Sequence, residues 1–568
     1  MTTFSVSLHK STNPMCILSG NLFLSIKLHN SITMFYNYNE DYQYDSCVSK
    51  GICSIGPRTS SLQEVLVMYL KLLAFYTIEL HSLGGVSKAA EDIILNTMSG
   101  LMYNLEFGNE QFRHTLFRLR SIIVDSKNTY LSICKSRGIE PKFIKTNLKV
   151  TNKLDLTSLI RLGEQEYTNK TEHLMPDRKN LFEIMFFIIK SLCINLVDIK
   201  SYEVNDSIEK TAYDEILILL NFLNYMDARL KDILHEIDKS VEINSQLLRI
   251  IRQAKIDRYG KPEPAEVSYS TRPNKAILVA GTNIRELEKV LEFTKDKNID
   301  VYTHGEMILA HMFPAFKKYP HLRGQYGTGV ENCLLDFATF PGAILIAKHS
   351  LENIEYLYRG RLFTTDNFVP PGVIKVNNDD FTQLVQSTLN AKGFKKGKQR
   401  ESITVGCAID EIGASLEPFL QNIKKYKQVI IIAPESNSQR NRLYFETLLK
   451  LIPDDIFVIT LSYSKESENV LYLNATSDFP FTYTILDVIH EKTKELGMDI
   501  SLFVSKCDKH VISNIINIKR LGVKNLFLSK CSPITLNPTL IQILDKAYNI
   551  KQATYAPNDL EQIINPQD

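Results

Sequence analysis

Eight side chains that can bind a metal or carry a proton follow short apolar runs in the second half of the chain. Each comes within a few residues of the end of a predicted strand: His304, Glu306, His349, Cys407, Glu435, Cys507, Asp508 and Cys531. In open α/β sheets, ligands bind at this carboxyl edge. Carboxylate, imidazole and thiolate groups together suit a transition metal or an iron–sulfur centre. Each residue alone is more often a turn residue or a buried thiol, so their shared placement predicts a site without fixing its chemistry.

The best-defined of these positions is the stretch 301–307. An apolar run ends at Val301, and a helical pattern opens at Glu306, which places His304 and Glu306 at a strand-to-helix turn. A structural alternative is a helix N-terminal carboxylate that stabilises the helix dipole, with His304 as a satisfied turn residue.

A second candidate is a pair of thiols, Cys47 and Cys53, in a loop that also contains Gly51. Such a loop can place two thiolates around one metal centre, as iron–sulfur sites require. Two cysteines supply half of the usual set of ligands, so free thiols in a loop remain an equal alternative.

The elements that must position these residues fall into two kinds. In the first part of the chain the apolar spacing predicts helices over 61–82, 88–105, 110–136, 179–200 and 209–254. No strand is predicted before residue 270. The helix at 61–82 begins at a capping box, Ser61 to Glu64. The polar segment 139–178 predicts a loop with short helices, and 258–264 predicts a linker because of its prolines and glycine. This part of the chain predicts a helical bundle.

After residue 266, short apolar runs alternate with helical patterns. The predicted strands are 276–280, 299–302, 343–347, 374–376, 403–405, 429–432, 457–460, 502–504 and 526–528. Alternation of this kind predicts parallel sheets covered by helices. The expected fold class is α + α/β, with a helical-bundle domain at 34–266 and two Rossmann-like parallel α/β domains at 267–395 and 396–568. Residues 1–33 form an extension.

The bulk properties are those of an ordinary globular protein. The net charge of +2 gives no electrostatic case for a nucleic-acid partner, and nine scattered cysteines suit reduced thiols better than a disulfide framework. No membrane partner is expected; the most apolar helical stretch, 181–197, carries Glu183 and Lys190.

Residues 1–33 lack Asp, Glu and Arg. We expect a cytoplasmic protein, or an organelle-matrix protein if this extension is a transit peptide. Met1 and Met34 both remain as the start of the working protein.

Several sequence blocks resemble the hybrid cluster protein, or prismane, family, which includes the hydroxylamine reductases and is related to the carbon monoxide dehydrogenases. The blocks are 301–307, Pro314, 318–322, 326–327, 340–345 and 361–365. The resemblance is strongest between residues 275 and 375. It implies a helical domain and two α/β domains, with an iron–sulfur cluster where the three meet.

The cluster ligands implied by this resemblance are only partly present. Glu306 matches a carboxylate ligand, Asp508 replaces a second one, and Cys47 and Cys53 match the second half of a four-cysteine motif. The remaining family ligands, a histidine and several cysteines, fall on or near other residue types: Thr282, Ser350, Glu435, Tyr463 and Asp478.

Three hypotheses follow. The first is a divergent oxidoreductase of hydroxylamine or nitric oxide, supplied with electrons by a small redox partner. Its rebuilt metal site would use Glu306, Asp508, Cys407, Cys507 and Cys531, with His304 or His349 as proton donor; Cys333 is a further available thiol. The second is a catalytically inactive paralogue that keeps the fold for binding or assembly. The third, a metal-free enzyme acting on a small anion, has least support because no glycine-rich phosphate motif follows a strand.

Overall fold

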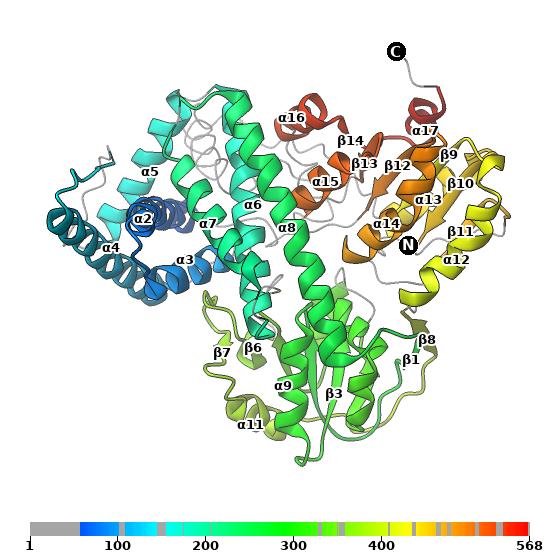
Figure 1. The fold of residues 1–568 in the computed structure, drawn as a ribbon. Coiled ribbons are helices and arrows are strands. Elements are labelled where there is room, and N and C mark those ends of the chain that lie inside the picture. The colour runs from blue at the N-terminus through cyan, green and yellow to red at the C-terminus, as the bar shows by residue number, and fades with distance from the viewer. Residues whose placement is uncertain are drawn as a thin grey trace, which may run out of the picture.

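The structure is a computed structural model that describes residues 57–101, 108–144, 155–173, 175–204, 206–225, 227–327, 332–348, 350, 358–406, 409–433, 439–461, 467–473, 479–505, 511–529 and 538–565. The first part of the described chain is helical, as the apolar spacing predicts, and forms a bundle beside two sheet-containing units (Figure 1). Its helices are α2 (Pro57–Ser82), α3 (Lys88–Gly100), α4 (Asn109–Arg137), α5 (Leu156–His173), α6 (Pro176–Ser201), α7 (Ser207–Phe222) and α8 (Leu230–Tyr259).

Helix α2 lies at the centre of the bundle and is buried on all sides along most of its length. Every described residue from Ser61 to Tyr76 is buried, and the buried Lys71 is paired with Glu166 of α5 at 3.7 Å. Within the described chain, Ser61–Ser82 is the segment long and apolar enough to cross a membrane, rather than the predicted 181–197. Because 78% of its apolar window is buried inside the protein, α2 has the environment of a core helix.

Three helix predictions differ from the structure. Helix α2 starts at Pro57, before the predicted capping box, since proline suits the first turn of a helix. The predicted loop at 139–178 contains the 18-residue helix α5, whose polar surface hid it from an apolar-spacing argument. The single helix predicted over 209–254 is two helices, α7 and α8, separated between Phe222 and Leu230.

The first α/β unit is a six-stranded parallel sheet with strand order β4-β3-β2-β5-β6-β7. Its strands are β2 (Lys275–Ala280), β3 (Ile299–His304), β4 (Leu322–Gln325), β5 (Ala343–Ile346), β6 (Leu362–Thr364) and β7 (Ile374–Lys375). The helices beside it are α9 (Ile284–Thr294), η2 (Gly305–Met312), η3 (Pro314–Lys318), α10 (Cys333–Thr339) and α11 (Thr382–Asn390). Buried aliphatic residues fill both faces of this sheet, which is why its strands are continuous apolar runs.

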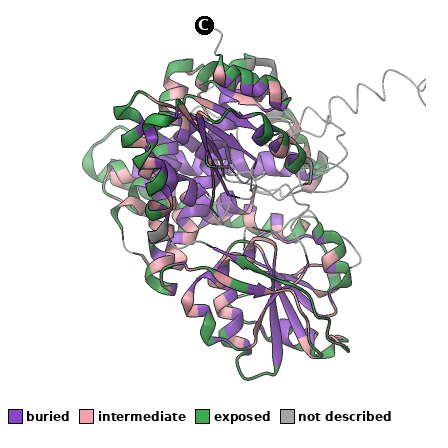
Figure 2. Ribbon diagram, turned by 90° about the vertical axis from the view of Figure 1, so that its right-hand side faces the viewer, coloured by how far each residue is buried: buried purple, intermediate pink, exposed green. Residues whose placement is uncertain are grey.

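The second α/β unit repeats the same plan with strand order β11-β10-β9-β12-β13-β14. Its strands are β9 (Gln428–Ile432), β10 (Ile456–Thr460), β11 (Val470–Tyr472), β12 (Asp499–Val504), β13 (Asn525–Leu528) and β14 (Ile550–Gln552). Its helices are α12 (Ile409–Gln421), α13 (Gln439–Leu451), α14 (Phe479–Glu495), α15 (Val511–Arg520), α16 (Pro538–Tyr548) and α17 (Ala556–Ile564). Figure 2 shows the buried sheets inside partly exposed helices. The predicted α + α/β class is confirmed.

Both sheets have the strand order of dinucleotide-binding folds, in which the order reverses next to the first strand. In the first sheet this reversal lies between β2 and β5, and in the second between β9 and β12. A reversal leaves room for a ligand beyond the carboxyl ends of the two strands, since their connections leave in opposite directions. The fold therefore marks two edges where a site is expected.

The strand predicted at 403–405 does not begin the second parallel sheet. Strand β8 (Ser402–Val405) pairs antiparallel with β1 (Ala265–Ser268), from Ala265 opposite Val405 to Ser268 opposite Ser402. Strand β1 was not predicted, because its four residues are mixed in polarity. The two strands form a ribbon at the point where the chain enters and leaves the first α/β unit (Figure 1).

Candidate functional site

The carboxyl end of β3 holds His304 and Glu306 as the sequence predicts. All six residues of β3 are buried, and Gly305 then turns the chain with φ of +59° into the 3-10 helix η2. The Gly305 carbonyl accepts a hydrogen bond from the Gln325 side-chain amide at 3.2 Å. This contact with β4 fixes the peptide that precedes Glu306, which is half-buried at the start of η2.

The His304 side chain is directed into the first α/β unit. Its Nε2 atom lies 3.1 Å from Asp336 Oδ2 of α10, and its ring packs against Phe337 with centroids 4.9 Å apart. Only 2% of the residue is exposed. This geometry matches the structural alternative of a satisfied turn residue, and the proton-donor role of His304 stays a prediction.

Behind η2, the His311 ring lies close to the buried Thr303 hydroxyl group, with Nε2 and Oγ1 separated by 3.1 Å. The Thr303 hydroxyl is also 2.6 Å from Gln325 Oε1. Burial lowers the pKa of His311 from 6.5 to about 4. The ring is therefore neutral at physiological pH and belongs to the framework under the site.

The switch point between β2 and β5 brings two hydroxyl groups together. Ser350 Oγ accepts a hydrogen bond from the Thr282 backbone N–H at 3.3 Å and lies 3.5 Å from Thr282 Oγ1. Gly281 makes this approach possible, because a Cβ atom there would lie 2.7 Å from Ser350 Cβ, and its φ of +109° also favours glycine. The family resemblance implies a histidine at the position of Thr282 and a cysteine at the position of Ser350.

These donors do not fit the iron–sulfur cluster that the resemblance implies. Such clusters are held by thiolates, in some cases with imidazoles, whereas Thr282 and Ser350 are neutral hydroxyl groups engaged with each other. Among the described residues no group of three or more His, Cys, Asp and Glu side chains is arranged to hold a metal ion. Cys333 is buried in an apolar cluster of the first α/β unit with Phe337 and Tyr358.

The other predicted site residues lie outside the described residues: Cys47, Cys53, His349, Cys407, Glu435, Tyr463, Asp478, Cys507, Asp508 and Cys531. The structure does place the strands that lead to some of them. Strands β12 and β13 are parallel neighbours, and the Ser529 N–H donates to the Val504 carbonyl at 2.9 Å. Ser505 and Ser529 are the first residues after these strands. In the sequence, Cys507 and Cys531 each follow two residues later.

Gly406, the last described residue before position 407, lies at the end of the β1–β8 ribbon and not at the edge of the second sheet. A Cβ atom on Gly406 would lie 2.8 Å from Cβ of Met312, the last residue of η2.

Sequence reasoning missed one buried carboxyl group close to this edge, that of Glu286. Its Oε2 atom accepts the Lys348 backbone N–H at 2.9 Å, and its Oε1 atom accepts the Thr365 hydroxyl group. Burial raises the pKa of Glu286 to about 7. An N-cap asparagine three residues earlier, Asn283, gave a sequence signal for a helix start, but nothing in the sequence showed that Glu286 would face the ends of β5 and β6.

We expect His311 to make the protein less stable as the pH falls from 6.5 towards 4. The unfolded chain takes up the proton near pH 6.5, but the folded chain only near pH 4. The unfolded state therefore binds more protons in this window, which removes up to about 3 kcal/mol of stability. Urea unfolding of the wild type and His311→Gln at several pH values measures this: the stability difference between them should shrink on acidification.

Glu286 should have the opposite effect on the pH dependence of stability, and it serves as the control for His311. Its folded-state pKa of about 7 lies above its ordinary value of 4.5, so the folded state binds more protons between these values. The stability from Glu286 is present at low pH and is lost as the pH rises through 7. Glu286→Gln should thus differ from the wild type with the reverse slope. Parallel slopes in the two variants would contradict both assignments.

The chain was compared with known proteins. A model of the Prismane/CO dehydrogenase family matches residues 43–473. A hydroxylamine reductase of Kosmotoga olearia is 26% identical over 584 aligned residues, which cover 94% of this chain and 100% of the relative. A hydroxylamine reductase of Syntrophobacter fumaroxidans is 24% identical, over 93% of this chain and 99% of the relative.

Proposed function

Because the chain belongs to the Prismane/CO dehydrogenase family, we propose that it is a divergent relative of the hydroxylamine reductases whose metal site has been rebuilt. The observation that carries this proposal is the pair of hydroxyl groups at the switch point of the first sheet, Thr282 and Ser350. The family architecture is retained around them, while the side chains at the edge have changed from soft to hard donors.

The proposed substrate is a small nitrogen–oxygen compound such as hydroxylamine or nitric oxide, with electrons from a small redox partner. We assign the rebuilt metal site to Glu306, at the start of η2, together with Asp508 and the thiols Cys407, Cys507 and Cys531. The adjacency of β12 and β13 supports the assignment of Cys507 and Cys531, since both thiols follow neighbouring strand ends. We also propose a cytoplasmic location, because nine scattered cysteines suit reduced thiols better than a disulfide framework.

Metal analysis tests this proposal. Protein purified without oxygen should contain iron, measured together with acid-labile sulfide and the visible spectrum. The iron content should fall in Cys507→Ala and in Cys531→Ala, because each removes one assigned ligand. Cys134→Ala is the matched control: this thiol is buried within α4 of the helical bundle, so its removal should leave the iron content unchanged.

A second candidate function is a catalytically inactive paralogue that binds or assembles. The same hydroxyl pair favours it, because Thr282 and Ser350 hold each other where a cluster would need an imidazole and a thiolate. Iron near zero in the anaerobically purified protein, with no turnover of hydroxylamine, would select this candidate. If both Cys47 and Cys53 are alkylated freely in the native protein, these two thiols do not bind a metal.

A further inference from the structure

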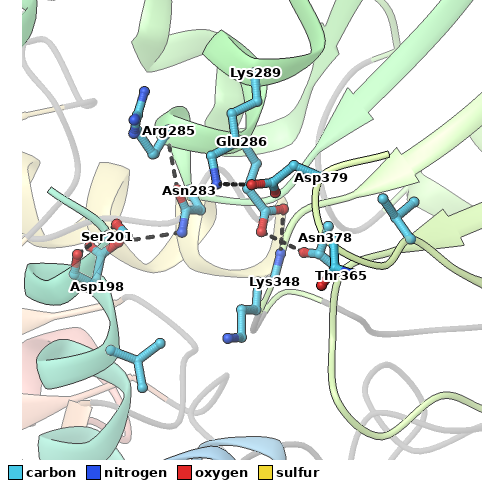
Figure 3. A pocket seen from close by; sticks show the side chains of 12 residues that line it. Asp198, Ser201, Asn283, Arg285, Glu286, Lys289, Lys348, Thr365, Asn378 and Asp379 are labelled. Carbon is cyan, nitrogen blue, oxygen red and sulfur yellow. Dashed lines mark hydrogen bonds and ion pairs between the residues drawn. The ribbon is translucent and has the colours of Figure 1, made fainter. Parts of the chain in front are cut away.

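A polar cavity of about 190 Å³ lies where the helical bundle meets the first α/β unit (Figure 3). Its wall comes from four directions: the end of α6, the first turns of α9, the ends of β5 and β6, and the segment after β7. The residues used below are Asp198, Asn283, Glu286, Lys348, Thr365 and Asn378. Glu306, the described member of the metal site proposed above, is not among the residues that line this cavity.

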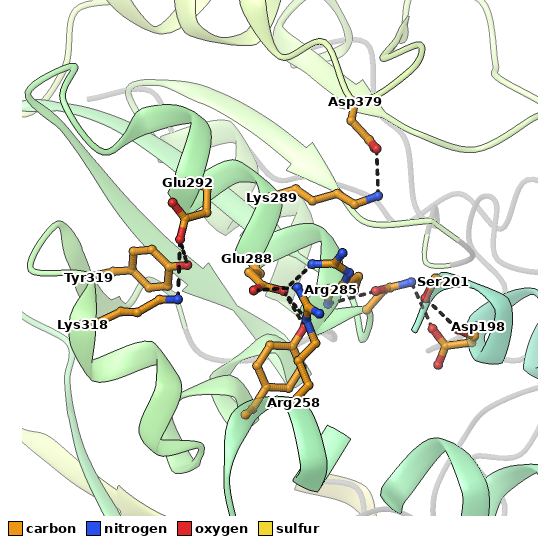
Figure 4. A network of polar contacts seen from close by, with 12 residues as sticks. Asp198, Ser201, Arg258, Arg285, Glu288, Lys289, Glu292, Lys318, Tyr319 and Asp379 are labelled. Atoms are coloured by element: carbon orange, nitrogen blue, oxygen red, sulfur yellow. Dashed lines mark hydrogen bonds and ion pairs between the residues drawn. The ribbon is translucent and has the colours of Figure 1, made fainter. Parts of the chain in front are cut away.

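Two of the cations around the cavity are already neutralised. Lys289 is paired with Asp379 at 2.9 Å, and Arg285 is paired with Glu288 at 2.6 Å (Figure 4). Glu288 also receives the guanidinium group of Arg258, at the end of α8. Arg285, Lys289 and Asp379 line the cavity. Together the pairs connect α8, α9 and the segment after β7.

Two other lysines are not neutralised in this way. Within the described part of the chain, neither the Lys348 nor the Lys375 ammonium group makes a hydrogen bond or an ion pair. Figure 3 shows the Lys348 side chain extending away from the Glu286 carboxyl group, with no interaction drawn to its nitrogen. Burial and the neighbouring Lys348 lower the pKa of Lys375, while Asp366 opposes this effect. Two half-buried like charges side by side are costly unless an anion lies between or beside them.

The acidic groups of the cavity offset these lysines only in part. Glu286 already accepts hydrogen bonds from Thr365 and the Lys348 backbone, and burial raises its pKa to about 7. Burial also raises the pKa of Asp198, against the opposing charges of Lys255 and Lys348. The Asp198 Oδ1 atom accepts the Asn283 amide at 3.3 Å. Both carboxyl groups therefore become neutral more readily than usual, which leaves the positive charge in excess as the pH falls.

We propose that this cavity binds a small oxyanion, held by the Lys348 ammonium group beside the N-terminal end of α9, with Lys375 adding positive potential. Helix α9 has 11 residues, and its positive dipole end faces the same space. The volume is below the roughly 300–1,000 Å³ of pockets for drug-sized ligands. The ligand class is thus limited to anions of a few heavy atoms, such as nitrite, formate or inorganic phosphate.

Isothermal titration of the full-length protein with nitrite, formate and phosphate, each in constant chloride, tests the proposal. At least one of the three should bind, and Lys348→Met should weaken it by about tenfold to a hundredfold, the value of one charge-assisted hydrogen bond. The double variant Lys289→Met/Asp379→Asn is the matched control: it removes an ion pair of the same cavity without changing the net charge, so the affinity should change by less than about threefold. The anion with the highest affinity then identifies the chemical class of the ligand.

The pH dependence gives a second readout. Binding of nitrite or formate, whose own charge is constant in this range, should strengthen from pH 8 to pH 6 as Glu286 takes up its proton. This dependence should disappear in Glu286→Gln. Equal binding of chloride, or unchanged affinity in Lys348→Met, would overturn the proposal. The titration measures binding and does not depend on catalytic turnover. Anion binding by a protein without reductase activity would therefore support this inference and contradict the proposed function.

Discussion

Replacing Arg361 by leucine is expected to lower the free energy of unfolding by about 3 kcal/mol or more. The guanidinium group of Arg361 donates to four backbone carbonyl groups around the end of α10 and the start of β5. The distances are 2.5 Å to Phe337, 3.1 Å to Ala338, 2.5 Å to Phe340 and 2.8 Å to Gly342. Leucine fills much of the space but leaves these acceptors without a donor, and unpaired buried polar groups are costly.

Equilibrium unfolding in urea measures this loss, with Arg229→Leu as the control. Arg229 also makes two side-chain hydrogen bonds, but to Asp232 on the exposed surface of α8. Its replacement should produce no measurable change, because exposed ion pairs add little to stability. Similar losses in the two variants would show that the four carbonyl contacts do not have the stabilising role assigned to them.

The second large effect is expected at Gly163, in the middle of α5. Helix propensity alone predicts that alanine there stabilises the protein by about 1 kcal/mol. The structure predicts the opposite sign, because a Cβ atom on Gly163 would lie 2.1 Å from the Ser61 carbonyl oxygen of α2. A backbone atom cannot move aside as a flexible side chain can, so α2 and α5 must separate. We expect Gly163→Ala to destabilise the protein by about 1–3 kcal/mol, as overpacking of a core does.

Gly413→Ala provides the matched control within α12. This glycine is also inside a helix, but no atom of the described residues lies within 4 Å of the position of an added Cβ atom. Alanine should therefore stabilise the protein by up to about 1 kcal/mol through propensity. Thermal unfolding of both variants tests whether the sign differs between the two sites. A gain at Gly163 equal to that at Gly413 would rule out the close packing of α2 against α5.

The fold could be predicted where the pattern of apolar residues is dictated by burial. The strands of the two parallel sheets are covered on both faces, so each is an apolar run that stands out from the helices around it. The helix α4 was predicted to within a residue at each end, since its buried residues recur every three or four positions along one face. Helix α5 and the β1–β8 ribbon could not be predicted in this way. Their residues are mixed in polarity, and the ribbon depends on pairing across more than a hundred residues.

For the candidate site, the sequence predicted only its position at the carboxyl edge of a parallel sheet. The sequence placed His304 and Glu306 at the end of a strand, and the parallel sheet puts them there. It could not reveal that His304 faces Asp336, which lies 32 residues away. Nor could it show that Thr282 and Ser350 touch, 68 residues apart, because this contact requires β2 and β5 to be neighbours. Side-chain direction and long-range adjacency come from the tertiary structure.

The antiparallel ribbon of β1 and β8 has a further consequence for how the protein is built. Because Ala265 is opposite Val405, the whole first α/β unit leaves and rejoins the rest of the chain through a single narrow stem. Such a stem is the geometry of an inserted module, whose two ends meet and could be linked by a short connection. The unit could therefore be excised for separate expression, or its strands circularly permuted, with no need to cut through the helical bundle or the second sheet.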